Sequence, residues 1–147
     1  MPRPVNALIV DDEPHVLVLL HALLKQLDIK TVWDAADGAT ALQQAAAHKP
    51  DVVLLDLNLP QIDGLHVLEK LKADYPKMPV IVVSAQSTQK TFMRARELGA
   101  EGYVLKYAPN AELLRMLSLE FDKLSGDSGA AARAKAPDPT DKPAEKP

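Results

Sequence analysis

Five polar side chains come directly after short apolar runs of the sequence, at positions where they could act together. Each apolar run is typical of a strand that is buried on both faces of a parallel sheet. The polar residues stand at the ends of these runs: Asp11 and Asp12, Asp56, Ser84, and Lys106. Because open α/β sheets bind ligands at the carboxyl ends of their strands, we expect these side chains to meet at one edge of the sheet.

Three carboxylates, one hydroxyl and one ammonium group would then share a small volume. Two carboxylates about 4 Å apart repel each other by roughly 4 kcal/mol at an effective dielectric constant of about 20. Either their pKa values rise or a cation joins them. Oxygen ligands without His or Cys favour a hard ion, and Mg²⁺ before the transition metals. With an aspartate nucleophile, a hydroxyl donor and a lysine, the set suits phosphoryl transfer to an aspartate.

Each of these residues also has an ordinary structural interpretation. Asp12 could cap the helix that follows, Ser84 could be a turn residue, and Lys106 could be a solvated strand end. These interpretations weaken together, because each would have to place a complementary group at the same edge by accident. The histidines lack metal-ligand spacing, and we assign surface or packing roles to them: His15, His21, His48 and His66.

The elements that must position this set follow from the apolar pattern. Strands are predicted at 5–10, 30–33, 52–55, 79–83 and 101–105, and helices at 16–27, 41–46, 65–74, 86–98 and 110–124. Short connections between alternating strands and helices favour right-handed crossovers, and therefore a parallel sheet with helices on both faces. The helix at 86–98 has a polar first half, so we expect it to be the least stable one.

Composition limits the remaining possibilities. The chain has 147 residues, a formal net charge of −3 and no cysteine, which excludes disulfides and thiolate chemistry and gives no electrostatic footprint for nucleic acid. Without a signal-peptide pattern or an apolar stretch of about 18 residues, we expect a cytoplasmic protein that does not bind membranes. We assign residues 1–124 to one domain. Residues 125–147 are rich in Ala, Pro and charges, and predict a disordered tail or linker.

Several stretches together resemble one family. Residues 8–13, 37–38, 50–64, 79–85 and 99–106 are similar, in order and spacing, to the receiver domain of two-component response regulators, the CheY-like group. The resemblance covers about residues 5–124. It implies a flavodoxin-like, doubly wound sheet of five parallel strands in the order 2-1-3-4-5 with five helices. The site would lie at the switch between the first and third strands.

The resemblance also implies roles for the carboxylates. Asp56 would be the phosphoacceptor, receiving a phosphoryl group from a sensor histidine kinase or a histidine phosphotransfer protein. Asp12 and Asp56 would ligate Mg²⁺ directly, together with the backbone carbonyl of Asn58, and Asp11 would bind it partly through water. This would be a signalling receiver that catalyses only its own phosphotransfer and autodephosphorylation.

The other roles concern the fourth and fifth strands. Ser84 and Lys106 would contact phosphoryl oxygens, and Tyr103 occupies the position of the switch aromatic residue. The output face would be the fourth helix, fifth strand and fifth helix. One position departs from the family: Pro usually follows the active-site Lys, but Tyr107 follows it here. A cis peptide before a residue other than Pro costs about 3–4 kcal/mol, so we expect a trans bond.

Alternative functions remain to be weighed. A phosphatase of the haloacid-dehalogenase type needs a second Asp two residues after its nucleophile, and the chain has Asn58 there. A receiver-like scaffold that is not phosphorylated, and the N-terminal receiver of a longer regulator whose output domain follows the linker, both stay open. The output would then pass to an unknown partner protein or a downstream domain. The chain would be a monomer or a phosphorylation-dependent dimer.

Overall fold

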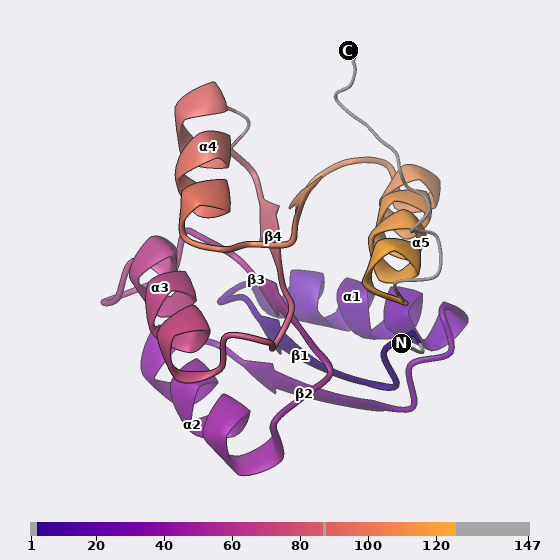
Figure 1. Ribbon diagram of the computed structural model, residues 1–147. Helices are drawn as coiled ribbons and strands as arrows, with labels where there is room; N and C mark the ends of the chain where they lie inside the picture. Colours follow the sequence, from indigo (N-terminus) through magenta and orange to yellow (C-terminus); the bar gives the residue numbers. More distant parts are fainter. Residues whose placement is uncertain (1–2, 87, 126–147) are drawn as a thin grey trace.

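The computed structural model describes residues 3–86 and 88–125, in which five short strands form one parallel sheet (Figure 1). The strand order is β2-β1-β3-β4-β5, which confirms the predicted topology. The strands are β1 (Asn6–Val10), β2 (Thr31–Ala35), β3 (Val52–Leu55), β4 (Val80–Ser84) and β5 (Gly102–Leu105). Of the predicted tail 125–147, only Ser125 belongs to the described residues, and it ends the last helix.

Helices cover both faces of the sheet (Figure 1). One face carries α1 (Pro14–Gln26) and α5 (Asn110–Ser125). The other carries α2 (Gly38–His48), α3 (Gly64–Asp74) and α4 (Gln89–Glu97). Successive residues of β1 point to opposite faces, so Ile9 joins the first core and Leu8 the second. Every residue of β3 and β4 is buried, which explains why these strands read as continuous apolar runs.

The fourth helix begins later than the sequence predicts. Its N-cap is Thr88, whose hydroxyl oxygen accepts a hydrogen bond from the Thr91 amide at 3.3 Å. Gln86 therefore belongs to the loop before α4, where it contacts the functional site. Ala95 is the one buried residue within α4. The low stability expected of this helix stays a prediction, although its small buried surface agrees with it.

The start of α3 packs very closely on the chain that leaves β3. A Cβ atom on Gly64 would lie 2.4 Å from the Leu57 Cα and 2.6 Å from the Asp56 carbonyl oxygen. The Gly64 amide also donates a hydrogen bond of 3.0 Å to the Leu57 carbonyl. The absence of a side chain at residue 64 thus lets α3 support the segment that holds Asp56.

We expect Gly64→Ala to lower the free energy of unfolding by about 1–3 kcal/mol, because backbone atoms cannot move aside for the new methyl group. Urea denaturation measures this difference. Gly38→Ala is the matched comparison at the first residue of α2, where the nearest atom, at 2.8 Å, is the flexible Val67 Cγ2. It should cost less. An equal cost for both variants would contradict the close approach of α3 to residues 56–57.

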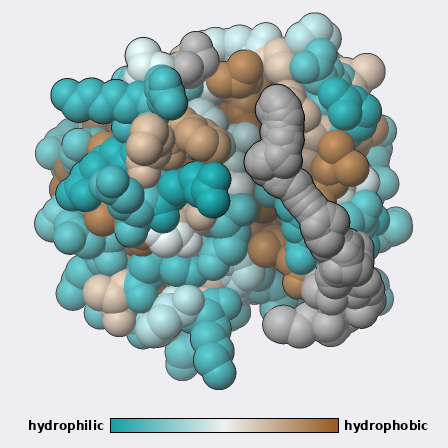
Figure 2. Space-filling model, turned by 45° about the horizontal axis from the view of Figure 1, so that its top comes forward, coloured by the Kyte–Doolittle hydropathy of each residue, from teal (hydrophilic) through white to brown (hydrophobic). Residues whose placement is uncertain are grey.

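Hydrophilic residues predominate on the face shown in Figure 2, and hydrophobic ones form small separate patches. Several large apolar side chains are nevertheless exposed: Val5, Val18, Phe92, Met93, Leu105, Tyr107 and Leu119. Among the described residues, none of the helices has the length and hydropathy needed to span a membrane.

Candidate functional site

The carboxyl ends of the strands bring the predicted residues together. Backbone hydrogen bonds continue for one residue past the strands: the Asp56 amide donates to the Val10 carbonyl at 2.9 Å, and the Lys106 amide to the Ser84 carbonyl at 2.9 Å. These bonds hold the following side chains at the sheet edge. Asp11, Asp12 and Asp56 each offer a carboxylate oxygen, and these oxygens lie within 4.8 Å of one another.

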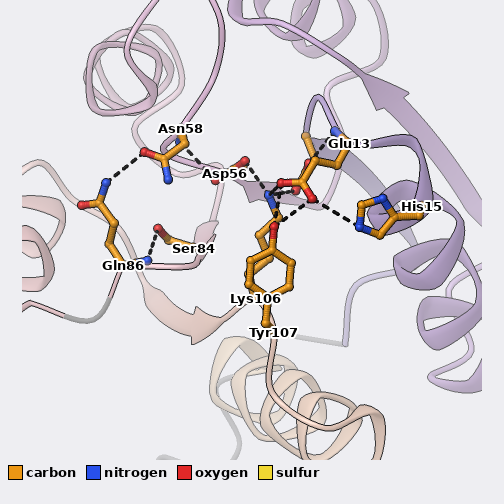
Figure 3. Close-up of polar contacts among 9 residues, drawn as sticks. Glu13, His15, Asp56, Asn58, Ser84, Gln86, Lys106 and Tyr107 are labelled. Atoms are coloured by element: carbon orange, nitrogen blue, oxygen red, sulfur yellow. Dashed lines mark hydrogen bonds and ion pairs between the residues drawn. The ribbon is translucent and has the colours of Figure 1, made fainter.

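Lys106 is the centre of this cluster (Figure 3). Its Nζ lies 2.9 Å from Asp56 Oδ2, 3.0 Å from Asp11 Oδ2 and 2.8 Å from Glu13 Oε2. The residue is only 3% exposed, so the solvated strand-end interpretation is wrong. Burial by itself disfavours the ammonium form, but hydrogen bonds to Glu13, Asp56 and Asp11 outweigh it and raise the pKa of Lys106. The lysine is therefore charged and partly neutralises the carboxylates.

Asp11 leaves one buried oxygen without a hydrogen bond. Its Oδ1 accepts from the Glu13 amide at 2.8 Å, whereas Oδ2, close to Lys106, has no hydrogen-bond partner among the described residues. Burial raises the pKa of Asp11, and the Glu13 amide and Lys106 oppose that rise. The N-cap of α1 is Glu13 rather than Asp12, so the capping interpretation of Asp12 lacks its contact. A buried free oxygen beside two further carboxylates, with oxygen ligands only, fits a hard divalent cation.

A second group of contacts crosses the site between β3 and β4. Gln86 donates from Nε2 to Asn58 Oδ1 at 2.9 Å and from its amide to Ser84 Oγ at 3.1 Å. The Asn58 amide donates to Asp56 Oδ1 at 3.1 Å. The Tyr103 hydroxyl donates to the Gln86 carbonyl at 2.7 Å. Gln86 thus links Ser84, Asn58 and Tyr103, three residues for which the sequence predicted separate roles.

The sequence analysis missed Glu13, Gln86 and Tyr107 as parts of the site. The Tyr107 hydroxyl lies 2.7 Å from Glu13 Oε2, although 94 positions separate the two residues in sequence. Hydrogen bonds from Lys106 and then Tyr107 lower the pKa of Glu13. No peptide bond among the described residues is cis, so the expected trans bond between Lys106 and Tyr107 is confirmed. An acidic residue two positions after Asp11 was the available signal, but nothing local in the sequence shows what it contacts.

Comparison with known proteins agrees with this geometry. The family model of the response regulator receiver domain matches residues 7–118. The chain belongs to this family. The probable transcriptional regulatory protein TcrX of Mycobacterium tuberculosis is 34% identical over 131 residues, which cover 87% of this chain and 56% of TcrX. The chain spans about half the length of the curated relatives it matches.

Solved receiver structures superpose well on the chain. The BeF3-activated N-terminal receiver domain of Klebsiella pneumoniae RstA is 32% identical, with a TM-score of 0.71 over 79% of this chain and 97% of that one. The CheX–CheY–BeF3–Mg²⁺ complex of Borrelia burgdorferi gives 26% identity and a TM-score of 0.75, over 81% and 90%. The protein is thus a CheY-like receiver domain of a signalling response regulator. Its pocket of Asp11, Asp12, Asp56 and Lys106 is consistent with a phospho-accepting receiver. Its three aspartates are typical of the Mg²⁺-binding site of such domains.

Removal of one carboxylate should show whether this site binds a metal ion. We expect Mg²⁺ at about ten times its Kd to raise the stability of the wild-type protein by roughly 1.4 kcal/mol, because the ion binds only the folded cluster. Asp12→Ala should lose most of this gain. In EDTA the variant should melt at or slightly above the wild-type temperature, since one like charge is gone. Thermal melts with and without Mg²⁺ measure both effects.

Asp74→Ala is the control for this test, because Asp74 ends α3 and pairs with Lys70 at 3.5 Å on the surface. It should keep the full response to Mg²⁺. Equal stabilisation of Asp12→Ala and the wild type would show that Asp12 is not a ligand. A clear loss of stability in EDTA would favour a structural role for Asp12.

Proposed function

We propose that the chain accepts a phosphoryl group on Asp56 from a sensor histidine kinase or a histidine phosphotransfer protein. The observation that carries the proposal is the position of Asp56, which is 1% exposed and hydrogen-bonded through Oδ2 to Lys106. It lies in a cluster with two further carboxylates. A buried nucleophile that shares a lysine and an oxygen-rich cation site is the arrangement that transfer to an aspartate requires.

The roles of the surrounding residues follow from their positions. Asp12, Asp56 and the backbone carbonyl of Asn58 would hold Mg²⁺, with Asp11 bound partly through water. When bound, Mg²⁺ would neutralise charge on the phosphoryl oxygens. An oxygen of Asp56 forms a bond to phosphorus while the bond from phosphorus to the donor breaks, and the leaving group keeps that electron pair. Lys106 then donates to a phosphoryl oxygen in place of the carboxylate it contacts in the unmodified chain.

The switch would use the contacts between β4 and β5. The Ser84 hydroxyl accepts from the Gln86 amide, and the Tyr103 hydroxyl donates to the Gln86 carbonyl. A phosphoryl group on Asp56 would compete for the Ser84 hydroxyl, so the loop at Gln86 would shift and release Tyr103. The Tyr103 ring packs edge to face on Phe92 of α4, with centroids 5.6 Å apart. Movement of this pair would change the output face formed by α4, β5 and α5.

The domain and partner assignments remain proposals too. Receiver domains partner with histidine kinases, and a cytoplasmic location, a domain over residues 1–124 and a monomer or phosphorylation-dependent dimer stay predictions. The second candidate is the N-terminal receiver of a longer regulator. The length of the curated relatives favours it, because the matched region is about half of TcrX. A regulator of that kind would pass the signal to an output domain, whereas a separate receiver would pass it to a partner protein.

Incubation with acetyl phosphate tests the proposal. In millimolar Mg²⁺, intact-mass spectrometry should show one added phosphoryl group that hydroxylamine removes, as expected of an acyl phosphate. In EDTA the mass should not change. Absence of labelling with Mg²⁺ present would favour the alternative of a receiver-like scaffold that is not phosphorylated.

A further inference from the structure

The loop after β5 contacts the start of α1 through one side-chain pair beside the site. The Tyr107 hydroxyl lies 2.8 Å from Glu13 Oε1 and 2.7 Å from Oε2, so its single proton is shared between the two carboxylate oxygens. Figure 3 shows the Tyr107 ring with its hydroxyl directed at Glu13, which lies next to the Lys106 ammonium. His15 approaches the same carboxylate, with Nε2 3.3 Å from Oε1.

Glu13 completes the set of partners around Lys106. An ammonium group has three N–H donors. Three carboxylate oxygens lie within 3.0 Å of Nζ, from Asp56, Asp11 and Glu13. Two of these carboxylates are buried, whereas the Glu13 side chain is 32% exposed. Glu13 is therefore the partner that water can most easily replace, unless another group holds it.

Tyr107 supplies that second hold. Oε2 of Glu13 accepts from both Lys106 Nζ, at 2.8 Å, and the Tyr107 hydroxyl. The Tyr107 ring also lies near the ammonium, with 5.5 Å from Nζ to the ring centroid. The residue itself is 61% exposed, so its ring contributes little to the core, and its specific contacts are those with the site.

We propose that Tyr107 is a positioning residue for phosphotransfer: its hydroxyl holds Glu13 on Lys106, and so fixes the ammonium beside Asp56 before the phosphodonor arrives. This inference rests on the proposed phosphorylation of Asp56. Without the hydroxyl, Glu13 turns to solvent more often and Lys106 loses one of its three anchors. The ammonium then occupies the productive position for less of the time, and transfer slows.

Tyr107→Phe tests the proposal, because it keeps the ring over Lys106 and removes only the donor. We expect labelling by acetyl phosphate at saturating Mg²⁺ to slow about threefold to tenfold, the size of effect that loss of one hydrogen bond to a charged group produces. Tyr75→Phe is the matched control, since Tyr75 ends α3 away from the site. It should label at the wild-type rate. In a Glu13→Ala background, Tyr107→Phe should have no further effect.

A second measurement needs neither phosphodonor nor metal ion. Nitrogen-15 NMR of lysine ammonium groups follows the exchange of the Lys106 Nζ protons with water in EDTA. We expect Tyr107→Phe to speed this exchange at least threefold, and Tyr75→Phe to leave it unchanged. Far-ultraviolet circular dichroism and the melting temperature show that each variant is folded.

The outcomes separate this inference from the function on which it rests. Unchanged labelling, or slower labelling with unchanged Lys106 exchange, overturns the positioning role. Wild-type protein that takes no label refutes phosphorylation of Asp56; faster Lys106 exchange in Tyr107→Phe would in that case still support the contact through Glu13. Slower labelling together with faster exchange supports both.

Discussion

Asp56→Asn should take no phosphoryl group from acetyl phosphate, in the presence or absence of Mg²⁺. The amide that replaces the carboxylate is not a nucleophile, so the expected effect is complete loss of labelling rather than a slower rate. The fold should survive, because an amide oxygen can still accept the hydrogen bond of 3.1 Å from the Asn58 amide. Lys106 keeps Asp11 and Glu13 as charged partners. Intact-mass spectrometry and a thermal melt check the two expectations.

Asp63→Asn is the control for this variant, because it makes the same chemical change in the same loop. The Asp63 side chain accepts from the Leu65 amide at 3.1 Å as the N-cap of α3. Asn is an equally good N-cap residue, so this variant should fold and label like the wild type. Undiminished labelling of Asp56→Asn would move the phosphoacceptor to another residue and refute the assignment.

Lys106→Met should be the most destabilising single change at the site. Removal of one partner of a buried ion pair leaves the other charges uncompensated, at a cost of about 3–5 kcal/mol. Here the carboxylates of Asp11 and Asp56, each 1% exposed, would lose their shared cation. Mg²⁺ should recover part of the loss, because a divalent cation can replace the ammonium charge within the cluster. Urea denaturation in EDTA and in millimolar Mg²⁺ measures both effects.

Lys70→Met provides the comparison, since Lys70 pairs with Asp74 on the surface at 3.5 Å and is 54% exposed at its side chain. Exposed ion pairs of this kind contribute about 0–1 kcal/mol. If Lys106→Met costs no more than this control, the carboxylate cluster does not depend on the lysine. A response to Mg²⁺ no larger than that of the wild type would show that the ion does not replace its charge.

The strand ends show what could be predicted from the sequence. Each buried strand is a continuous apolar run, because a parallel sheet covered by helices has no solvent-facing side. The first polar residue after such a run must therefore lie at the carboxyl edge of the sheet. That local rule placed Asp11, Asp56, Ser84 and Lys106 together, and the structure has all four buried. The strand order came from the family resemblance, and the pairing of β1 with both β2 and β3 confirms it.

Residues outside that rule show where the sequence alone is insufficient. The polar stretch before α4 reads equally well as helix or loop, and its boundary depends on Thr88 acting as the N-cap. Gln86 consequently lies over the site and contacts Asn58, 28 positions away in sequence. Glu13 and Asp12 are adjacent carboxylates in the sequence, yet only Glu13 contacts Lys106 within hydrogen-bonding distance.

By itself, the sequence determined that this chain forms a parallel α/β sheet and that its carboxyl edge carries an acidic cluster with a lysine. Local apolar runs and the chemistry of the residue after each run are sufficient for those conclusions. The tertiary structure alone decided that Lys106 is shared by three carboxylates, and that Tyr107 reaches Glu13 across 94 positions of the chain. The physical reason is that such contacts depend on the relative placement of two loops, at the ends of β1 and β5. Only the packing of α1 and α5 on one face of the sheet sets that placement.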